Sequence, residues 1–149
     1  MRKIVIFGER KGPNTDPFNP LYPHTTHGAA ARLIRMFGVD VNEYLENTAR
    51  YNVFQHGHQD FSLEEARERV GTLHLRHLEE DPKCEFIFLG KAALRGAPNP
   101  EWRELQYFQS LGAVHLIPHP SGANLVYNDA ENVRQAALLL RGVWERAKL

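Results

Sequence analysis

Polar side chains that could bind or transform a small molecule are concentrated in four segments of this 149-residue chain. The segments span 8–24, 52–60, 90–93 and 118–128, and each follows or ends a short hydrophobic run. Together they contain carboxylates, imidazoles, carboxamides, a guanidinium and a hydroxyl, on Glu9, Arg10, Asn14, Asp16, Asn52, His56, His58, His119, Ser121, Asn124 and Asn128. If these segments meet in space, their side chains form a binding or catalytic site. The alternative is that they are ordinary polar loops.

Composition sets limits on the function. Lys plus Arg (18) balances Asp plus Glu (18), which excludes a strongly basic protein that coats nucleic acid but allows a local basic patch. Cys84 is the single cysteine, so one chain cannot form an internal disulfide, a zinc knuckle or a cysteine-ligated iron–sulfur cluster. No apolar run approaches the roughly 20 residues that span a bilayer, and residues 1–8 lack the features of a signal peptide. We therefore expect a cytoplasmic protein with no membrane partner.

The elements that would position these segments alternate in type. Short hydrophobic runs predict strands at 3–7, 50–55, 85–89 and 113–117. Helical periodicity predicts helices at 25–37, 62–79, 101–110 and from 128 or 129 to about 147. Thr25 or Thr26 is expected to cap the first helix, and Ser62 with Glu65 forms a capping box for the second.

Strands that alternate with helices favour a parallel α/β sheet covered on both faces. The sequence therefore predicts one domain, 1–149, built as a three-layer sandwich around a central four-stranded parallel sheet. In open parallel sheets, ligands bind beyond the carboxyl ends of the strands. The polar segments follow the predicted strands, so we expect them at that edge.

Several of these segments resemble motifs of one family, the uracil-DNA glycosylase superfamily. Gly8-Glu9-Arg10-Lys11-Gly12-Pro13 resembles its opening Gly-Glu-Ala-Pro-Gly motif, especially that of the iron–sulfur branch. That branch has a base-stacking phenylalanine thirteen residues after the motif's glutamate, and Tyr22 occupies this position here. The helix predicted at 26–37 then corresponds to the first helix of the family.

The later motifs follow in the same order. Tyr51-Asn52-Val53-Phe54 resembles the strand that ends in the base-reading asparagine, and Ser62-Leu63-Glu64-Glu65 resembles the start of the next helix. Phe88-Leu89-Gly90-Lys91-Ala92-Ala93 is similar to the Leu-Gly strand end, and His119-Pro120-Ser121 to the His-Pro-Ser motif. The resemblance covers nearly the whole chain and implies a uracil-DNA glycosylase-like fold.

The sequence also departs from the family pattern. The cysteines that hold the iron–sulfur cluster are missing, so no cluster is implied. Arg10 stands where the best-known uracil-excising branch has its catalytic aspartate, and Lys11 replaces a proline. Gly122 rather than proline follows Ser121.

The resemblance implies a role for each matching residue. Tyr22 would stack on the base, Asn52 would read its edge, and His119 would donate a hydrogen bond to the base oxygen where charge develops. Glu9 would orient the attacking water, with Asp16 as a second candidate that could instead close the turn at 14–17. The remaining substrate-binding candidates are Gly8, Arg10 and Gly12 in the first motif and Ser121 and Asn124 in the last loop. Arg10 and Lys11 could bind a phosphate. Leu125 in the last loop is a candidate wedge in the duplex.

The resulting hypothesis is a DNA glycosylase-like protein that recognises uracil or a modified or deaminated base. Its partner would be DNA, single-stranded or a damaged or modified duplex, or a free nucleotide, and it would hydrolyse the N-glycosidic bond. A base-binding module without catalysis and a nucleotide-processing enzyme that transfers phosphate or deoxyribose remain as alternatives. We expect no cofactor and no obligate protein partner. We also expect no metal, because the pairs His56/His58 and His74/His77 lack further ligands.

Overall fold

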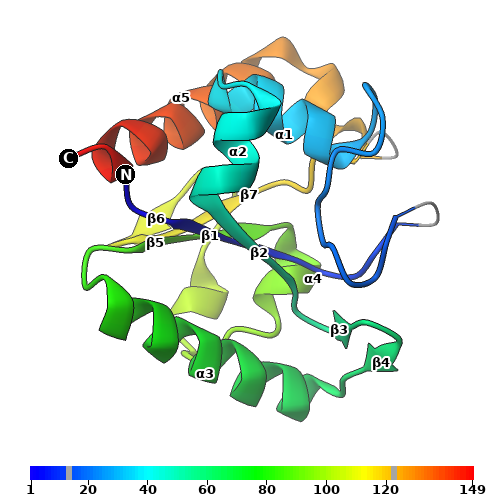
Figure 1. The fold of residues 1–149 in the computed structure, drawn as a ribbon, viewed down its shortest axis with the longest axis vertical. Coiled ribbons are helices and arrows are strands. Elements are labelled where there is room, and N and C mark those ends of the chain that lie inside the picture. Colours follow the sequence, from blue (N-terminus) through cyan, green and yellow to red (C-terminus); the bar gives the residue numbers. More distant parts are fainter. Residues whose placement is uncertain (13–14, 122–123) are drawn as a thin grey trace.

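A mixed seven-stranded sheet forms the centre of the protein (Figure 1). The computed structural model describes residues 1–12, 15–121 and 124–149, so Pro13, Asn14 and Gly122 of the predicted motifs and segments lie outside the described residues. Four strands are parallel and run in the order β2-β1-β5-β7: β1 (Ile4–Gly8), β2 (Thr48–Asn52), β5 (Glu85–Leu89) and β7 (Val114–Ile117).

The prediction of a four-stranded, wholly parallel sheet is wrong in its extent. Two-residue antiparallel strands widen the sheet at both edges: β3 (Gln55–His56) and β4 (Gln59–Asp60) beside β2, and β6 (Ser110–Leu111) beside β7. Gly57 and Gly112 lie in the two turns with φ of 58°, a conformation that glycine adopts without strain. Such short strands carry no detectable alternation in the sequence.

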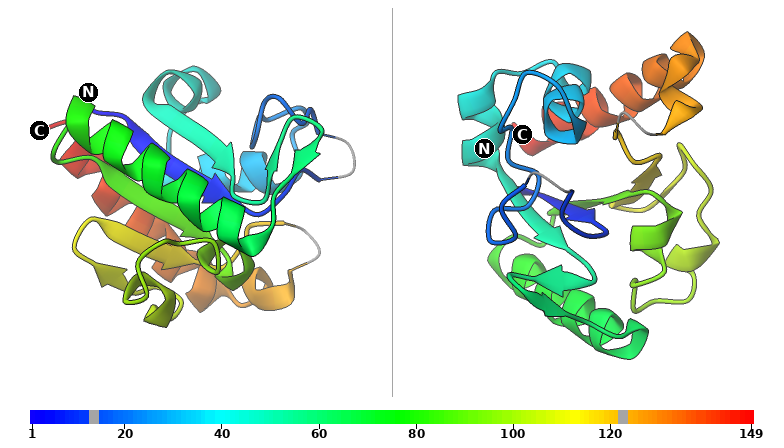
Figure 2. Two further views of the ribbon diagram at one scale, coloured as in Figure 1. Left: turned by 90° about the horizontal axis from the view of Figure 1, so that it is seen from below. Right: turned by 90° about the vertical axis from the view of Figure 1, so that its right-hand side faces the viewer.

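Helices cover both faces of the sheet, which gives the predicted three layers (Figures 1 and 2). The helices α1 (Ala29–Phe37), α2 (Val41–Asn47) and α5 (Ala130–Ala147) pack on one face, and α3 (Leu63–Glu80) and α4 (Lys91–Leu94) pack on the other. Side chains of β1 alternate between the two cores, with Ile4 and Ile6 facing α1 and α5 and with Val5 and Phe7 facing α3. Burial on both faces explains the continuous apolar run of this strand.

Local capping fixes where most helices begin. The predicted capping box of α3 is confirmed, because Ser62 and Glu65 bond each other's backbone N–H groups, and Asp129 caps α5 as expected. α1 begins at Ala29 rather than at Thr25, because the Thr25 hydroxyl bonds the backbone of His27 instead of capping the helix. No sequence pattern predicted α2, which Asp40 caps.

The helix predicted at 101–110 is wrong. That stretch contains one 3₁₀ turn, η1 (Trp102–Glu104), and a second 3₁₀ turn, η2 (Leu125–Asn128), precedes α5. Phe108 donates its N–H to Leu116 and has φ of 66°, which is incompatible with a helix. Pairing with β7 has therefore replaced the helical pattern.

Candidate functional site

A cavity of about 830 Å³ opens at the carboxyl ends of the parallel strands. Most of the predicted site residues line it: Glu9, Arg10, Gly12, Tyr22, Asn52, His119, Ser121 and Asn124. They come from the last residue of β2 and from the segments after β1 and β7, which the sheet brings to one edge. The structure thus brings together residues that lie more than 100 positions apart in the sequence.

Two predicted site residues lie outside the lining. Gly8 is buried behind Asn52, and a Cβ atom added there would lie 3.2 Å from the Asn52 Oδ1 atom. Gly8 therefore leaves room for the Asn52 carboxamide. Asp16 is exposed, and its carboxylate accepts the Phe18 N–H at 2.9 Å, so Asp16 closes a turn, which was the alternative to a catalytic role.

Asn52 ends β2 with its side chain in the wall of the cavity. The residue is 2 % exposed, and its Nδ2 atom has no hydrogen-bond partner among the described residues. Its backbone carbonyl accepts a hydrogen bond from Arg69 Nη1 at 2.6 Å, which anchors the strand end to α3. A buried polar group without a partner costs about 1–3 kcal/mol of stability, so this amide is conspicuous.

His119 is held as a neutral hydrogen-bond donor. The backbone N–H of Ser121 donates to His119 Nδ1 at 3.1 Å, so the proton of the neutral ring is on Nε2. Burial lowers the pKa of His119, and the negative charge of Glu9 partly opposes that shift. Near pH 7 the ring therefore offers an Nε2–H group at the cavity wall.

Asn124 positions the loop that carries His119. Its Nδ2 donates to the His119 carbonyl at 2.9 Å, and its Oδ1 accepts the Val126 N–H at 3.1 Å. Arg32 Nη1 lies 3.4 Å from the Ser121 carbonyl and ties the same loop to α1. Because both ends of the Asn124 side chain are engaged, we assign it to positioning. The neighbouring Leu125, the candidate wedge, is 72 % exposed.

The loop after β1 is anchored through its backbone and through Arg10. Phe54 donates its N–H to the Glu9 carbonyl at 3.1 Å, while Arg10 Nη1 contacts Asp60 Oδ1 at 3.0 Å and the Phe54 carbonyl at 3.2 Å. The Glu9 carboxylate has no partner among the described residues and is the single acidic group in the cavity lining that the structure describes. Glu9 is therefore available to a ligand, whereas Arg10 is engaged with the β3–β4 hairpin.

Tyr22 follows a backbone turn that a buried tyrosine supports. Leu21 has φ of 54°, an unusual conformation for a leucine, and its carbonyl accepts the Tyr44 hydroxyl at 2.8 Å. The Tyr22 ring centroid lies 5.0 Å from that of His24, and both residues line the cavity. Tyr44 thus helps to place an aromatic ring at the cavity wall.

Sequence reasoning missed the first turn of α1 as part of the site. Gly28, Ala29 and Ala30 line the cavity together with Thr25 and His27. A run of small residues at the start of a helix is a sequence signal for backbone contacts with a ligand. No sequence signal marked Arg69 or Tyr44, which act from other layers of the fold.

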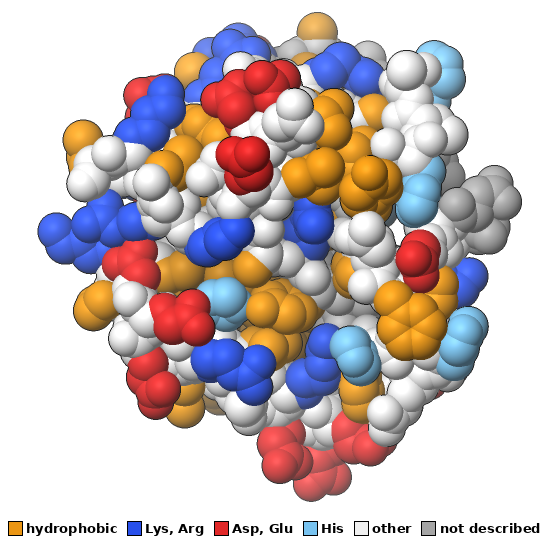
Figure 3. Space-filling view, in the orientation of Figure 1, with side chains coloured by type: hydrophobic (Ala, Val, Ile, Leu, Met, Phe, Trp, Pro, Cys, Tyr) orange, Lys and Arg blue, Asp and Glu red, His pale blue; other side chains and the backbone are white. Residues whose placement is uncertain are grey.

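The histidine pairs do not build a metal centre in the described ranges. His56 and His58 lie outside the cavity lining and pack edge-on against Phe18, and several histidines gather on the side where β3 and β4 lie (Figure 3). His77 Nε2 lies 2.8 Å from the Tyr51 hydroxyl. Across 1–12, 15–121 and 124–149, no three side chains of His, Cys, Asp or Glu gather closely enough to hold a metal ion.

Comparisons with models of known protein families, with curated proteins and with solved structures find no match for this chain. Among the residues that the structure describes, no helix has the length and apolar character to cross a membrane. Function must therefore be inferred from the cavity and its residues.

Proposed function

We propose that the cavity recognises a nucleobase and that the protein hydrolyses the N-glycosidic bond of that base. The observation that carries the proposal is the Asn52 carboxamide, which is buried in the cavity wall with its Nδ2 atom unpartnered among the described residues. A carboxamide presents two donors and an acceptor in one plane, which suits the hydrogen-bonding edge of a heterocycle. A bound base would supply the missing partner.

Aromatic stacking would add to this recognition. Tyr22 lines the same cavity, and a base stacked on an aromatic ring gains about 1–3 kcal/mol. Asn52 would then discriminate between bases through their edges, while Tyr22 would hold any base by its face. The resemblance to uracil-DNA glycosylases assigns the same two roles to these positions.

The remaining groups fit the hydrolysis step. The oxygen of a water molecule bonds to C1′ of the sugar while the C1′–N bond breaks, and its electron pair leaves with the base. Glu9 accepts a proton from the water, and the His119 Nε2–H group donates a hydrogen bond to the base oxygen that gains charge. Such a preorganised donor contributes about 2.7–4 kcal/mol to transition-state stabilisation. The departing base then takes up a proton from solvent, and Glu9 releases its proton to solvent.

Arg10 has no part in this step. It occupies the position of the catalytic aspartate in the best-known uracil-excising branch, but its guanidinium contacts Asp60 and Phe54. Glu9 stands one position earlier and is the available carboxylate of the lining. The proposal therefore assigns the water-activating role to Glu9.

The test is release of free base, measured by chromatography. Single-stranded and duplex oligonucleotides with uracil, hypoxanthine, xanthine or a modified base are incubated with the protein, in parallel with the corresponding mononucleotides. We expect release from at least one substrate, with a large loss of rate in Glu9→Gln.

Asp16→Asn is the matched control for Glu9→Gln. It also removes one carboxylate, but Asp16 lies outside the lining and asparagine can still accept the Phe18 N–H, so the rate should not change. Binding of a base without release would overturn the hydrolysis step and favour a binding module. The absence of both binding and release across the panel would overturn the whole proposal.

A further inference from the structure

The amino-terminal end of α1 lines the cavity with unused hydrogen-bond donors. Gly28 precedes the helix and provides no side-chain cap, and the Thr25 hydroxyl is engaged with the backbone of His27. The N–H groups of Ala29, Ala30 and Ala31 have no acceptor among the described residues, since the first backbone bond of this end joins Arg32 to Gly28. The end also lacks an acidic residue in its first turn.

Several neighbouring features favour an anion at this end. Converging N–H groups and the helix dipole attract negative charge. The side chains at the helix start are no larger than a methyl group, so a ligand can approach the backbone. Lys11 and Arg10 lie in the same lining, where Glu9 is the single carboxylate among the described residues.

A second observation connects this end to the base site. The Asn52 carboxamide, 2 % exposed and unpartnered at Nδ2 within the described part of the chain, lines the same cavity as Ala29 and Ala30. A cavity of about 830 Å³ falls in the usual range of roughly 300–1,000 Å³ for sites that enclose a whole small ligand. It has room for more than a base.

We propose that the cavity takes a nucleoside 5′-monophosphate, with the base at Asn52 and the phosphate at the first turn of α1. This inference rests on the proposed function and names its substrate class. A terminal phosphate carries a charge near −2 and three free oxygens, which match three converging N–H groups better than a phosphodiester does. The chain also carries no excess of the positive charge on which DNA affinity largely depends.

The first experiment is calorimetric titration of the full chain. The probes are uracil, thymine, cytosine, adenine and guanine 2′-deoxynucleosides, each with and without a 5′-phosphate, and single-stranded oligonucleotides of the same bases. For the recognised base, the monophosphate should bind at least tenfold more tightly than the nucleoside. Equal affinity for the two forms, or tighter binding of the oligonucleotide, would overturn the proposal.

Two substitutions locate the phosphate. Ala29→Glu places a negative charge in the first turn of α1, where it favours the helix but repels a phosphate, so the tenfold advantage of the monophosphate should disappear. Ala29→Gln reports the effect of side-chain size. It should lower the affinity for the monophosphate at least fivefold less than Ala29→Glu does. Ala130→Glu puts the same charge in the first turn of α5, outside the cavity lining, and should leave both affinities unchanged.

Inorganic phosphate separates this inference from the proposed function. In the amide NMR spectrum, phosphate alone should shift the Ala29–Ala31 resonances. A phosphate shift with no binding of any base or nucleoside would overturn base recognition and leave the phosphate site standing. Binding of a nucleoside with no phosphate shift would overturn the phosphate site and leave base recognition standing.

Discussion

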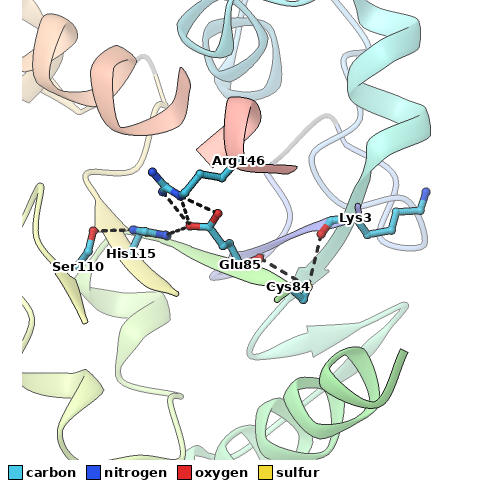
Figure 4. Close-up of polar contacts among 6 residues, drawn as sticks. All are labelled: Lys3, Cys84, Glu85, Ser110, His115 and Arg146. Carbon is cyan, nitrogen blue, oxygen red and sulfur yellow. Dashed lines mark hydrogen bonds and ion pairs between the residues drawn. The ribbon is translucent and has the colours of Figure 1, made fainter. Parts of the chain in front are cut away.

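The amino ends and the carboxyl ends of the parallel strands, which we term the amino edge and the carboxyl edge, use similar polar residues in opposite ways. At the amino edge, Ser110, His115, Glu85 and Arg146 form a closed group, which we term the amino-edge cluster (Figure 4). Ser110 Oγ lies 2.5 Å from His115 Nδ1, His115 Nε2 lies 2.8 Å from Glu85 Oε1, and Arg146 Nη2 lies 2.8 Å from the same oxygen. Both ring nitrogens of this histidine are engaged within the protein.

At the carboxyl edge, polar groups remain available. His119 uses Nδ1 internally but has no partner for Nε2 in the described part of the chain, and the Asn52 Nδ2 atom is likewise unpartnered there. Satisfied buried networks stabilise a fold, whereas unsatisfied buried groups weaken it. The comparison indicates that the amino edge serves stability and that the carboxyl edge keeps its donors for a ligand.

Cys84 also lies at the amino edge. Its thiol donates to the Lys3 carbonyl at 3.4 Å, next to the amino-edge cluster (Figure 4). Burial, reinforced by the charges of Asp81 and Glu85, raises the pKa of the Cys84 thiol to about 12. A thiol with so high a pKa is a poor nucleophile at neutral pH.

The largest expected loss of stability is at the amino edge. Glu85→Ala leaves the buried His115 ring without its charged acceptor, which costs about 1.5–3 kcal/mol of unfolding free energy, while the half-exposed Arg146 adds little. Urea denaturation measures the loss. Glu145→Ala, which breaks the exposed pair with Lys148, should change stability little. Similar losses for the two variants would show that the amino-edge cluster does not stabilise the fold.

The two histidines should separate catalysis from stability. His119→Ala removes the cavity donor and should slow base release by about 10²–10³-fold, equivalent to about 2.7–4 kcal/mol. His115→Gln disrupts the amino-edge cluster and should lower the urea midpoint while the release rate of the folded protein stays unchanged. If His115→Gln slowed release as strongly as His119→Ala, the assignment of function to one edge would be wrong.

Asn52→Leu should raise stability while abolishing base binding. The substitution removes a buried amide without a partner, so unfolding free energy should increase by about 1–3 kcal/mol. This predicted gain in unfolding free energy is opposite in sign to the loss expected for Glu85→Ala. Urea denaturation and calorimetric titration with nucleosides measure the two effects. A clear loss of stability would mean that the Asn52 side chain is already satisfied in the folded protein.

Acidification should weaken the fold modestly. Burial lowers the pKa of His74, His77, His115 and His119 below the usual value of about 6.5, with Glu85 partly opposing the shift at His115 and Glu9 at His119. As pH falls through that value, the unfolded chain takes up protons that the folded chain does not, so stability decreases. Each histidine whose pKa is lowered in the folded state changes the unfolding free energy by at most about 1.4 kcal/mol per pH unit.

Urea midpoints between pH 8 and pH 5 measure this dependence. His115→Gln and His119→Gln should each make it shallower, because each removes one buried histidine. A midpoint that stayed constant or rose on acidification would show that these rings are not held neutral in the folded state.

The sequence predicted the elements that depend on burial and capping. The strand at 85–89 is buried on both faces after Glu85 and reads as an apolar run from Phe86 to Leu89, and the Ser62 and Glu65 pair marks the start of α3. Because parallel strands present their carboxyl ends at one edge, the position of the cavity followed from the prediction of a parallel sheet.

What the sequence could not reveal depends on contacts between distant residues. Thr25 and Asp16 can each cap a helix or close a turn, and the neighbouring backbone decides between these uses. The pairing of Phe108 with Leu116 replaced a helix that periodicity favoured. Neither the support of Asn52 by Arg69 nor the closure of the amino-edge cluster has a local signal, because the partners lie in different elements.

The Asn52 side-chain amide gives the most direct test of base recognition. In ¹⁵N-labelled protein its resonances are identified by their loss in Asn52→Asp. Free uracil, thymine, cytosine, hypoxanthine and adenine are then added one at a time at millimolar concentration, and xanthine and guanine at saturation. We predict that at least one base shifts the Asn52 amide resonances, because its edge accepts the unpartnered donor. Unchanged Asn52 resonances with every base would contradict the account.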